Sequence, residues 1–168
     1  MDKKQACIEL YKEAFGDEGQ FMIDLFESNF NNCRYIIKDT QVAAMLFLLP
    51  CVLVTNGERI SAYYLYAAAT AEKHRKQGIM TRLLEEMLKE VSAPIFLKPA
   101  NEKLIAFYEK RGFKTIDATR ERPKENVIES EFTRFGGEAR KDGSRYTLMY
   151  RWDKALKVTS IAFDSPMD

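Results

Sequence analysis

The amino-acid sequence predicts an α+β fold, a mixed α/β sheet with helices on both of its faces. Two observations carry most of this prediction. Apolar residues recur at helical spacing near the N-terminus and again over residues 78–92. Between these helices lie β-branched and aromatic runs, and the turn signal Asn56-Gly57 joins two of them into an antiparallel hairpin.

The N-terminal half is predicted to hold two helices followed by an antiparallel meander. Residues 3–15 and 18–29 have apolar side chains close to the 3.6-residue period, and Gly16 is suited to end the first helix. The period then changes to that of strands. Three strands are predicted, at residues 34–38, 42–54 and 59–70.

The C-terminal half is predicted to alternate helices and strands. An amphipathic helix covers residues 78–92, and a shorter helix over 101–111 has Asn101 as its N-cap and ends before Gly112. Strands are predicted at residues 94–98, 113–116 and 146–152. The polar segment 117–144 is long for a connection, so it holds either a short helix or a segment that covers a site.

Length and charge limit the classes of function. The chain of 168 residues fits a single domain, residues 1–168, with a core of its own. Lysine and arginine total 26 against 25 for aspartate and glutamate, which gives a net charge of +1. Because nucleic-acid-binding proteins usually have a clear basic excess, no nucleic acid is expected as a partner.

The composition also predicts a cytoplasmic protein without membrane contact. Three cysteines without CxxC spacing suit a reducing compartment, and no apolar leader follows the first charged residues. The longest apolar run, Val42 to Val54, is too short to cross a bilayer and is interrupted by Pro50. One histidine and scattered thiols predict no metal site. The sequence leaves open whether the chain forms a homodimer.

The segment with the clearest chemistry joins a predicted strand to the helix over 78–92. It reads Ala67-Ala-Ala-Thr-Ala-Glu-Lys-His-Arg-Lys-Gln-Gly-Ile-Met80. Backbone N–H groups at a helix start attract anions, and Gly78 lets a ligand approach the backbone closely. Three basic residues beside it can neutralise phosphates, namely Lys73, Arg75 and Lys76. The segment therefore predicts a phosphate cradle, although it has neither the P-loop nor the dinucleotide-binding pattern of glycines.

Residues Arg75 to Met80 resemble the pyrophosphate-binding motif of the GNAT superfamily of acetyltransferases, Q/R-x-x-G-x-G/A. Met80 stands where that motif has a small residue. With Ala-Ala-Thr upstream and Leu83-Leu84 downstream, the stretch is similar to the bacterial enhanced-intracellular-survival acetyltransferases. A second match strengthens the resemblance, since Asn101 to Phe113 resembles the family's signature N-x-x-x-x-A-F/Y-Y-x-x-x-G-F.

The resemblance implies a central, mostly antiparallel sheet with splayed central strands, and acetyl-CoA as the co-substrate. It implies that the backbone of Ala68, Ala69 and Thr70 pairs with the pantetheine arm and that Asn101 contacts this arm. The residues implied to hold the pyrophosphate are Arg75, Lys76, Gln77, Gly78, Ile79, Met80 and Thr81.

The resemblance also places Tyr108 near the thioester sulfur. A phenol with an unperturbed pKa of about 10 can protonate a departing thiolate, so Tyr108 is the candidate general acid. A backbone N–H near Ala69 or Thr70 would polarise the thioester carbonyl.

Simpler explanations exist for several of these residues. A basic run can be only a solvated surface, Asn101 only an N-cap, and Tyr108 only a core aromatic. His74 is predicted to be a surface residue, and Cys51 a buried small residue rather than a nucleophile.

Two functions of different classes fit these observations. The first is an N-acetyltransferase that moves an acetyl group from acetyl-CoA to a primary amine, on a small molecule or a peptide or protein, by direct attack. The alternative is a catalytically weak GNAT-fold module that binds acyl-CoA as a sensor or scaffold. No carboxylate is singled out as the general base. Three are candidates by predicted proximity alone, namely Asp24, Glu27 and Glu72.

Overall fold

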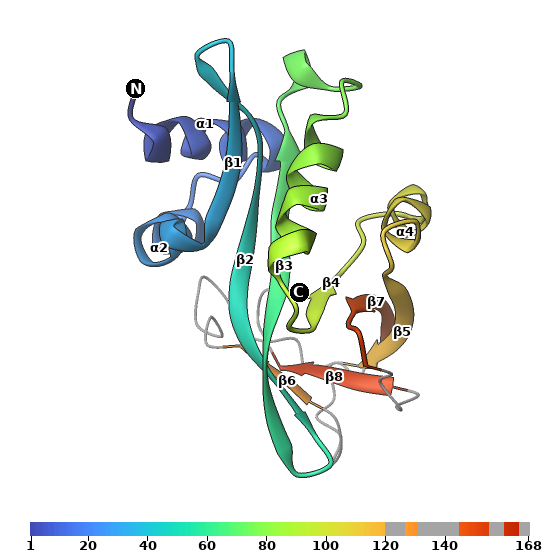
Figure 1. The fold of residues 1–168 in the computed structure, drawn as a ribbon. Coiled ribbons are helices and arrows are strands. Elements are labelled where there is room, and N and C mark those ends of the chain that lie inside the picture. Colours follow the sequence, from blue (N-terminus) through green and yellow to red (C-terminus); the bar gives the residue numbers. More distant parts are fainter. Residues whose placement is uncertain (120–126, 131–144, 155–159, 165–168) are drawn as a thin grey trace. The chain divides into compact units, whose positions relative to one another are not determined.

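The computed structural model describes residues 1–119, 127–130, 145–154 and 160–164 (Figure 1). Its helices are α1 (Lys3–Phe15), α2 (Gln20–Asn29), α3 (Ile79–Glu90) and α4 (Glu102–Glu109), with 3₁₀ turns η1 (Phe30–Asn32) and η2 (Glu72–His74). Its strands are β1 (Cys33–Lys38), β2 (Gln41–Thr55), β3 (Glu58–Thr70), β4 (Ile95–Leu97), β5 (Lys114–Thr119), β6 (Val127–Ser130), β7 (Arg145–Arg151) and β8 (Ser160–Asp164). The mixed α/β fold and each helix and strand predicted from the sequence are therefore confirmed.

The chain divides into two units, which are described separately. The first unit comprises Met1–Leu49 and Leu65–Val91, and the second comprises Pro50–Tyr64 and Ser92–Asp168. Strands β2 and β3 contribute residues to both.

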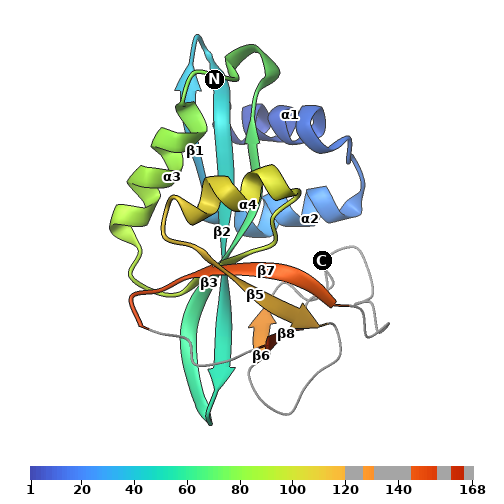
Figure 2. The same cartoon turned by 90° about the vertical axis from the view of Figure 1, so that its right-hand side faces the viewer.

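In the first unit, α1 and α2 lie on one face of the strands and α3 lies on the other (Figures 1 and 2). The helix pair packs through aromatic rings: Phe26 meets both Tyr11 and Phe47 edge to face, with ring centroids 5.7 Å and 5.3 Å apart. Helix α3 buries the apolar stripe expected from its period, namely Ile79, Leu83, Leu84, Met87 and Leu88. Helices on both faces, as predicted, give this unit a core on each side of its strands.

Two hairpin turns set the register of the N-terminal strands. Asp39 and Thr40 join β1 to β2 with φ of +52° and +64°, and Asn56 and Gly57 join β2 to β3 with φ of +49° and +76°. Positive φ at both central residues is the geometry of turns that match the twist of paired strands. The hairpin predicted at Asn56-Gly57 is confirmed.

In the second unit the strands pair in a ring. The order in the eight-stranded sheet of the described residues is β1-β2-β3-β4-β7-β5-β8-β6, and β6 also pairs with β2 through Cys51–Val54. The pairs β3–β4, β5–β8 and β6–β8 are parallel, and the pairs β1–β2, β2–β6, β4–β7 and β5–β7 are antiparallel. A closed arrangement leaves fewer exposed strand edges.

The polar segment 117–144 differs from its prediction where it is described. Neither alternative anticipated that β5 extends through Asp117–Thr119 or that Val127–Ser130 forms strand β6. The sequence also gave no indication of β8. Residues 120–126 and 131–144 lie outside the described residues.

Candidate functional site

The residues between β3 and α3 form a segment called here the cradle loop (residues 71–78). Helix α3 begins after Gly78, and the N–H of Arg82 donates to the Gly78 carbonyl at 3.0 Å. Among the described residues no side chain caps this helix start. By contrast, Asp2 caps α1 and Asn101 caps α4. The start of α3 therefore presents backbone N–H groups to an external acceptor.

The backbone of the cradle loop is held in an uncommon conformation. Lys76 has φ of +62° and Gly78 has φ of +72°. An L-residue such as Lys76 in this region is strained, and such strain concentrates at ligand sites. A Cβ added to Gly78 would meet no atom within 4 Å, so open space lies in front of the backbone.

The charge of the cradle loop suits an anion. The side chains of Lys73, Arg75 and Lys76 are all exposed around the start of α3. They add to the positive end of the helix dipole. Together, these features have the charge and backbone geometry that suit phosphate groups.

The end of β3 lies next to this loop. Arg75 Nε donates to the carbonyl oxygen of Thr70 at 3.4 Å, which ties the loop back to the strand. Further back, Ala67 has φ of +53° inside the strand. Positive φ within a strand is typical of a β-bulge, which bends the strand and interrupts its ladder. Ala68 to Thr70 therefore follow a change in strand direction.

The parallel ladder between β3 and β4 is short. Among the described residues it comprises the register pairs Tyr63–Ile95 and Tyr64–Phe96, with Tyr63 N–H also donating to the Pro94 carbonyl at 2.9 Å. The ladder thus ends before the bulge at Ala67, in agreement with the splayed central strands that the family resemblance implied.

Contacts with the β1–β2 hairpin hold the cradle loop in place. The N–H of Ala71 donates to the Ala43 carbonyl at 2.8 Å. The Nε2 atoms of Gln41 and His74 lie 2.9 Å apart, within hydrogen-bonding distance. Since Gln41 and Ala43 are distant from the loop in sequence, the motif gave no signal for them.

His74 corrects one prediction. It was expected at the surface, but its side chain is only 2% exposed. The reason is η2, because this single turn directs His74 inward while its neighbours Lys73 and Arg75 stay in solvent. Sequence periodicity cannot reveal such a short turn.

An aromatic and acidic cluster adjoins β3 in the same unit. The ring of Tyr66 meets Phe21 edge to face at 6.0 Å, and Tyr11 donates its hydroxyl to Asp17 Oδ2 at 3.5 Å. Burial is the main cause that raises the pKa of both Tyr11 and Tyr66 above the ordinary phenol value. Both phenols therefore stay neutral and able to donate hydrogen bonds.

The remaining predicted site residues, Asn101 and Tyr108, belong to the second unit. The Asn101 side chain accepts from the Leu104 N–H at 3.1 Å, which confirms its prediction as N-cap of α4. Tyr108 is 7% exposed and packs edge to face against Phe107 and Phe113, with centroids 5.2 Å and 5.4 Å apart. Its ring is thus held by packing on two sides.

The protonation of Tyr108 follows from its surroundings. Burial raises the pKa of its hydroxyl to about 12, although the nearby Arg111 guanidinium acts in the opposite direction. The phenol is therefore fully protonated at neutral pH, as a proton donor must be.

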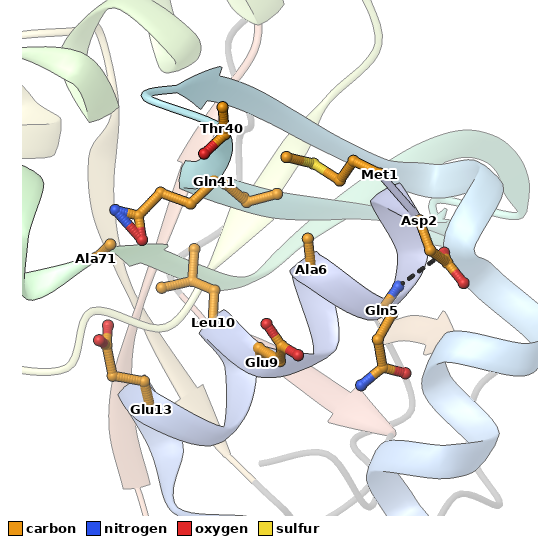
Figure 3. Close-up of a pocket in the computed structure, with 11 residues that line it drawn as sticks. Met1, Asp2, Gln5, Ala6, Glu9, Leu10, Glu13, Thr40, Gln41 and Ala71 are labelled. Carbon is orange, nitrogen blue, oxygen red and sulfur yellow. Dashed lines mark hydrogen bonds between the residues drawn. The ribbon is translucent and has the colours of Figure 1, made fainter.

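A pocket of about 440 Å³ lies in the first unit between α1 and the β1–β2 hairpin (Figure 3). Its polar lining includes the carboxylates of Asp2, Glu9 and Glu13, and its described lining has no lysine or arginine. Carboxylates repel phosphate groups, so the acidic pocket is distinct in chemistry from the basic cradle loop.

The family model described as "Acetyltransferase (GNAT) domain" matches residues 1–116. The chain belongs to the GNAT acetyltransferase family. Among curated protein sequences, none matches this chain.

Solved structures of GNAT proteins have the same fold. The GNAT protein YhbS from Escherichia coli, in complex with CoA, has a TM-score of 0.62 at 17% identity, over 95% of this chain and 82% of that one. A probable N-acyltransferase from Enterococcus faecalis has a TM-score of 0.59 at 18% identity, over 70% of this chain and 32% of that one. Eis1 from Mycobacterium abscessus has a TM-score of 0.54 at 12% identity, over 74% of this chain and 33% of that one.

This GNAT chain therefore spans about a third of the length of the Enterococcus and Mycobacterium proteins that it resembles. None of the helices in the described part of the chain has the length and apolar character needed to cross a bilayer. The same residues contain no group of three or more His, Cys, Asp or Glu side chains that could hold a metal ion.

Proposed function

We propose that this protein transfers an acetyl group from acetyl-CoA to a primary amine, and that its two units act as one catalytic domain in the cytoplasm. The observation that carries the proposal is the start of α3, where no described side chain caps the helix and Gly78 leaves open space before the backbone. In a GNAT protein, such an anion-binding turn fits the pyrophosphate of CoA.

Each residue predicted to contact the cofactor is assigned a role in binding. The backbone N–H groups of Lys76 to Thr81 would hold the pyrophosphate. The N–H of Arg75 already donates to the Glu72 carbonyl at 3.3 Å, so Arg75 would act through its exposed side chain, which with the other basic side chains of the cradle loop would offset the ligand's charge. Ala68 to Thr70 would pair with the pantetheine arm as an added strand. Asn101 would contact the same arm while it caps α4.

The chemistry is a direct transfer. The ammonium group of the acceptor first loses a proton to water, and the free amine nitrogen forms a bond to the acetyl carbon as the carbon–sulfur bond breaks. A second proton leaves the nitrogen for solvent, and Tyr108 regains from solvent the proton that it gives to the thiolate. An N–H near Ala69 or Thr70 stabilises the oxyanion that forms meanwhile. Tyr108 donates its proton to the departing thiolate, which its raised pKa of about 12 permits because the hydroxyl stays protonated at neutral pH.

The cluster beside β3 supports a cationic acceptor. Tyr66 and Phe21 offer aromatic surfaces, and Asp17 offers a carboxylate beside the Tyr11 hydroxyl. Aromatic faces and carboxylates both attract ammonium groups. Small amines, peptide N-termini and lysine side chains all carry such a group.

The experiment is an assay of free CoA thiol released from acetyl-CoA with a panel of amines. An amine-dependent release, with the acetylated product identified by mass spectrometry, supports the transferase. Tight CoA binding by calorimetry without release for any amine class would favour the alternative, a GNAT-fold sensor or scaffold. Absence of CoA binding would overturn both.

A further inference from the structure

The β1–β2 hairpin places a lysine beside the cradle loop. Lys38 is the last residue of β1, and its Nζ donates a hydrogen bond to Oε1 of Gln77 at 2.6 Å. Gln77 immediately precedes Gly78, after which α3 begins. The amide oxygen of Gln77 is neutral, so this contact does not neutralise the ammonium of Lys38.

The position of Lys38 is fixed by the backbone around it. Lys38 pairs with Gln41 across the hairpin, and the turn between them has positive φ at both residues. Gln41 in turn contacts His74, and Ala43 accepts the Ala71 N–H. Three separate contacts therefore join the hairpin to the cradle loop, and the side chain of Lys38 reaches Gln77, the residue before the N-cap Gly78 of α3.

We infer that Lys38 binds a phosphate group of CoA and completes the cradle loop from the hairpin side. This inference rests on the proposed function, since it assumes that CoA binds at the start of α3. The other cations at the site, Lys73, Arg75 and Lys76, all come from the loop itself. Lys38 adds a cation from a segment about 40 residues earlier, outside the motif by which the site is recognised.

The chemistry of the contact favours exchange of partners. Lys38 already donates to an oxygen at the site, so a phosphate oxygen can replace the amide oxygen of Gln77 as its acceptor. Against a phosphate both partners are ionised, so the hydrogen bond gains a Coulomb attraction between opposite charges that the neutral amide oxygen of Gln77 does not supply. Because Lys38 is exposed, water and salt reduce this gain.

The test is calorimetric titration of the full chain with CoA. Lys38→Gln is expected to weaken binding by about 5- to 20-fold, and Lys38→Arg is expected to retain most of the affinity. Lys89→Gln is the matched control, because it removes the same charge from the exposed last turn of α3, roughly 15 Å from its start. The control is expected to bind CoA like the unsubstituted protein.

Salt dependence separates a phosphate ligand from a residue that only supports the loop. If Lys38 binds phosphate, the affinity of Lys38→Gln falls less steeply with salt than that of the unsubstituted protein. A parallel titration with 3′-dephospho-CoA identifies the group. If Lys38→Gln lowers the affinity for CoA but not for 3′-dephospho-CoA, Lys38 binds the 3′-phosphate. If the substitution lowers the affinity for both ligands equally, Lys38 binds the pyrophosphate.

Three outcomes would overturn the inference. Equal affinity of Lys38→Gln and the unsubstituted protein would remove Lys38 from the site and leave the proposed function intact. A loss of affinity with unchanged salt dependence would make Lys38 a purely structural contact. Absence of CoA binding by the unsubstituted protein would overturn the proposed function, and the inference with it.

Discussion

The side chains of Gln41 and His74 meet at 2.9 Å and join the β1–β2 hairpin to the cradle loop. His74 is almost fully buried, so Gln41 gives its ring nitrogen a partner in place of water. A loop that carries strained backbone at Lys76 needs such a support, because the surrounding structure must hold the strained conformation.

Gln41→Ala is expected to lower the free energy of unfolding by about 1–2 kcal/mol, because it leaves a buried nitrogen of His74 without its partner. Thermal unfolding followed by circular dichroism measures the change. Gln5→Ala is the control, since Gln5 lines the same acidic pocket but is exposed. Equal midpoints for the two variants would show that the Gln41–His74 contact adds no stability.

Gly78→Ala is expected to lower stability by about 1–2 kcal/mol, because φ of +72° strains any residue with a Cβ. It is also expected to weaken CoA binding by about tenfold or more, because the added Cβ would occupy the open space through which the ligand approaches the backbone. Gly57→Ala is the matched control, because Gly57 has φ of +76° and similar open space, but lies in the β2–β3 turn. If both variants bound CoA as tightly as the parent in calorimetry, the cradle loop would be misassigned.

Tyr108→Phe is expected to lower kcat by about 10²–10⁴-fold while KM for acetyl-CoA changes little, because only the hydroxyl is lost and the packing against Phe113 is kept. Steady-state thiol release measures both constants. Tyr35→Phe, on the partly exposed strand β1, is expected to keep full turnover. An unchanged kcat in Tyr108→Phe, with chemistry as the slow step, would mean that water protonates the thiolate.

Stability is expected to fall at alkaline pH. Burial raises the pKa of Tyr108 from 10.0 to about 12, so the folded chain keeps a proton that the unfolded chain loses in this range. The contribution of neutral Tyr108 to the free energy of unfolding is fully present below pH 10 and is lost as the pH rises towards 12. The loss amounts to roughly 2–3 kcal/mol in total. Urea unfolding between these pH values should show that the free energy of unfolding falls less steeply with pH for Tyr108→Phe than for the parent. Superimposable pH profiles for the variant and the parent would contradict the raised pKa.

Much of the fold was predictable because its signals are local. The apolar stripe of α3, the Asn101 cap and the Asn56-Gly57 turn each depend on residues close together in the sequence. Strands β6 and β8 were missed because they depend on pairing partners that are not adjacent in the sequence. Strand β6 pairs with Cys51–Val54, more than 70 residues earlier, and with β8. A strand of four residues has too little alternation to be recognised alone.

The site divides in the same way. The motif singled out Arg75 to Met80 as a candidate site, because the turn before α3 is contained in one short segment. It did not predict Lys38 or Gln41, whose contacts with Gln77 and His74 span 39 and 33 positions. Side chains brought together by a hairpin share no spacing that a single sequence can show.

The three contacts between hairpin and cradle loop also have a consequence for local opening. A ligand that binds only the folded loop suppresses every fluctuation that opens it, by about 2.7 kcal/mol at a ligand concentration of 100 Kd. Gln41 and Ala43 stay hydrogen-bonded to the loop when Lys38 exchanges Gln77 for a phosphate oxygen, so the hairpin tip should share this protection. Amide hydrogens around Thr40 are therefore expected to exchange more slowly when CoA is bound, and those of the Asn56-Gly57 turn to exchange at an unchanged rate.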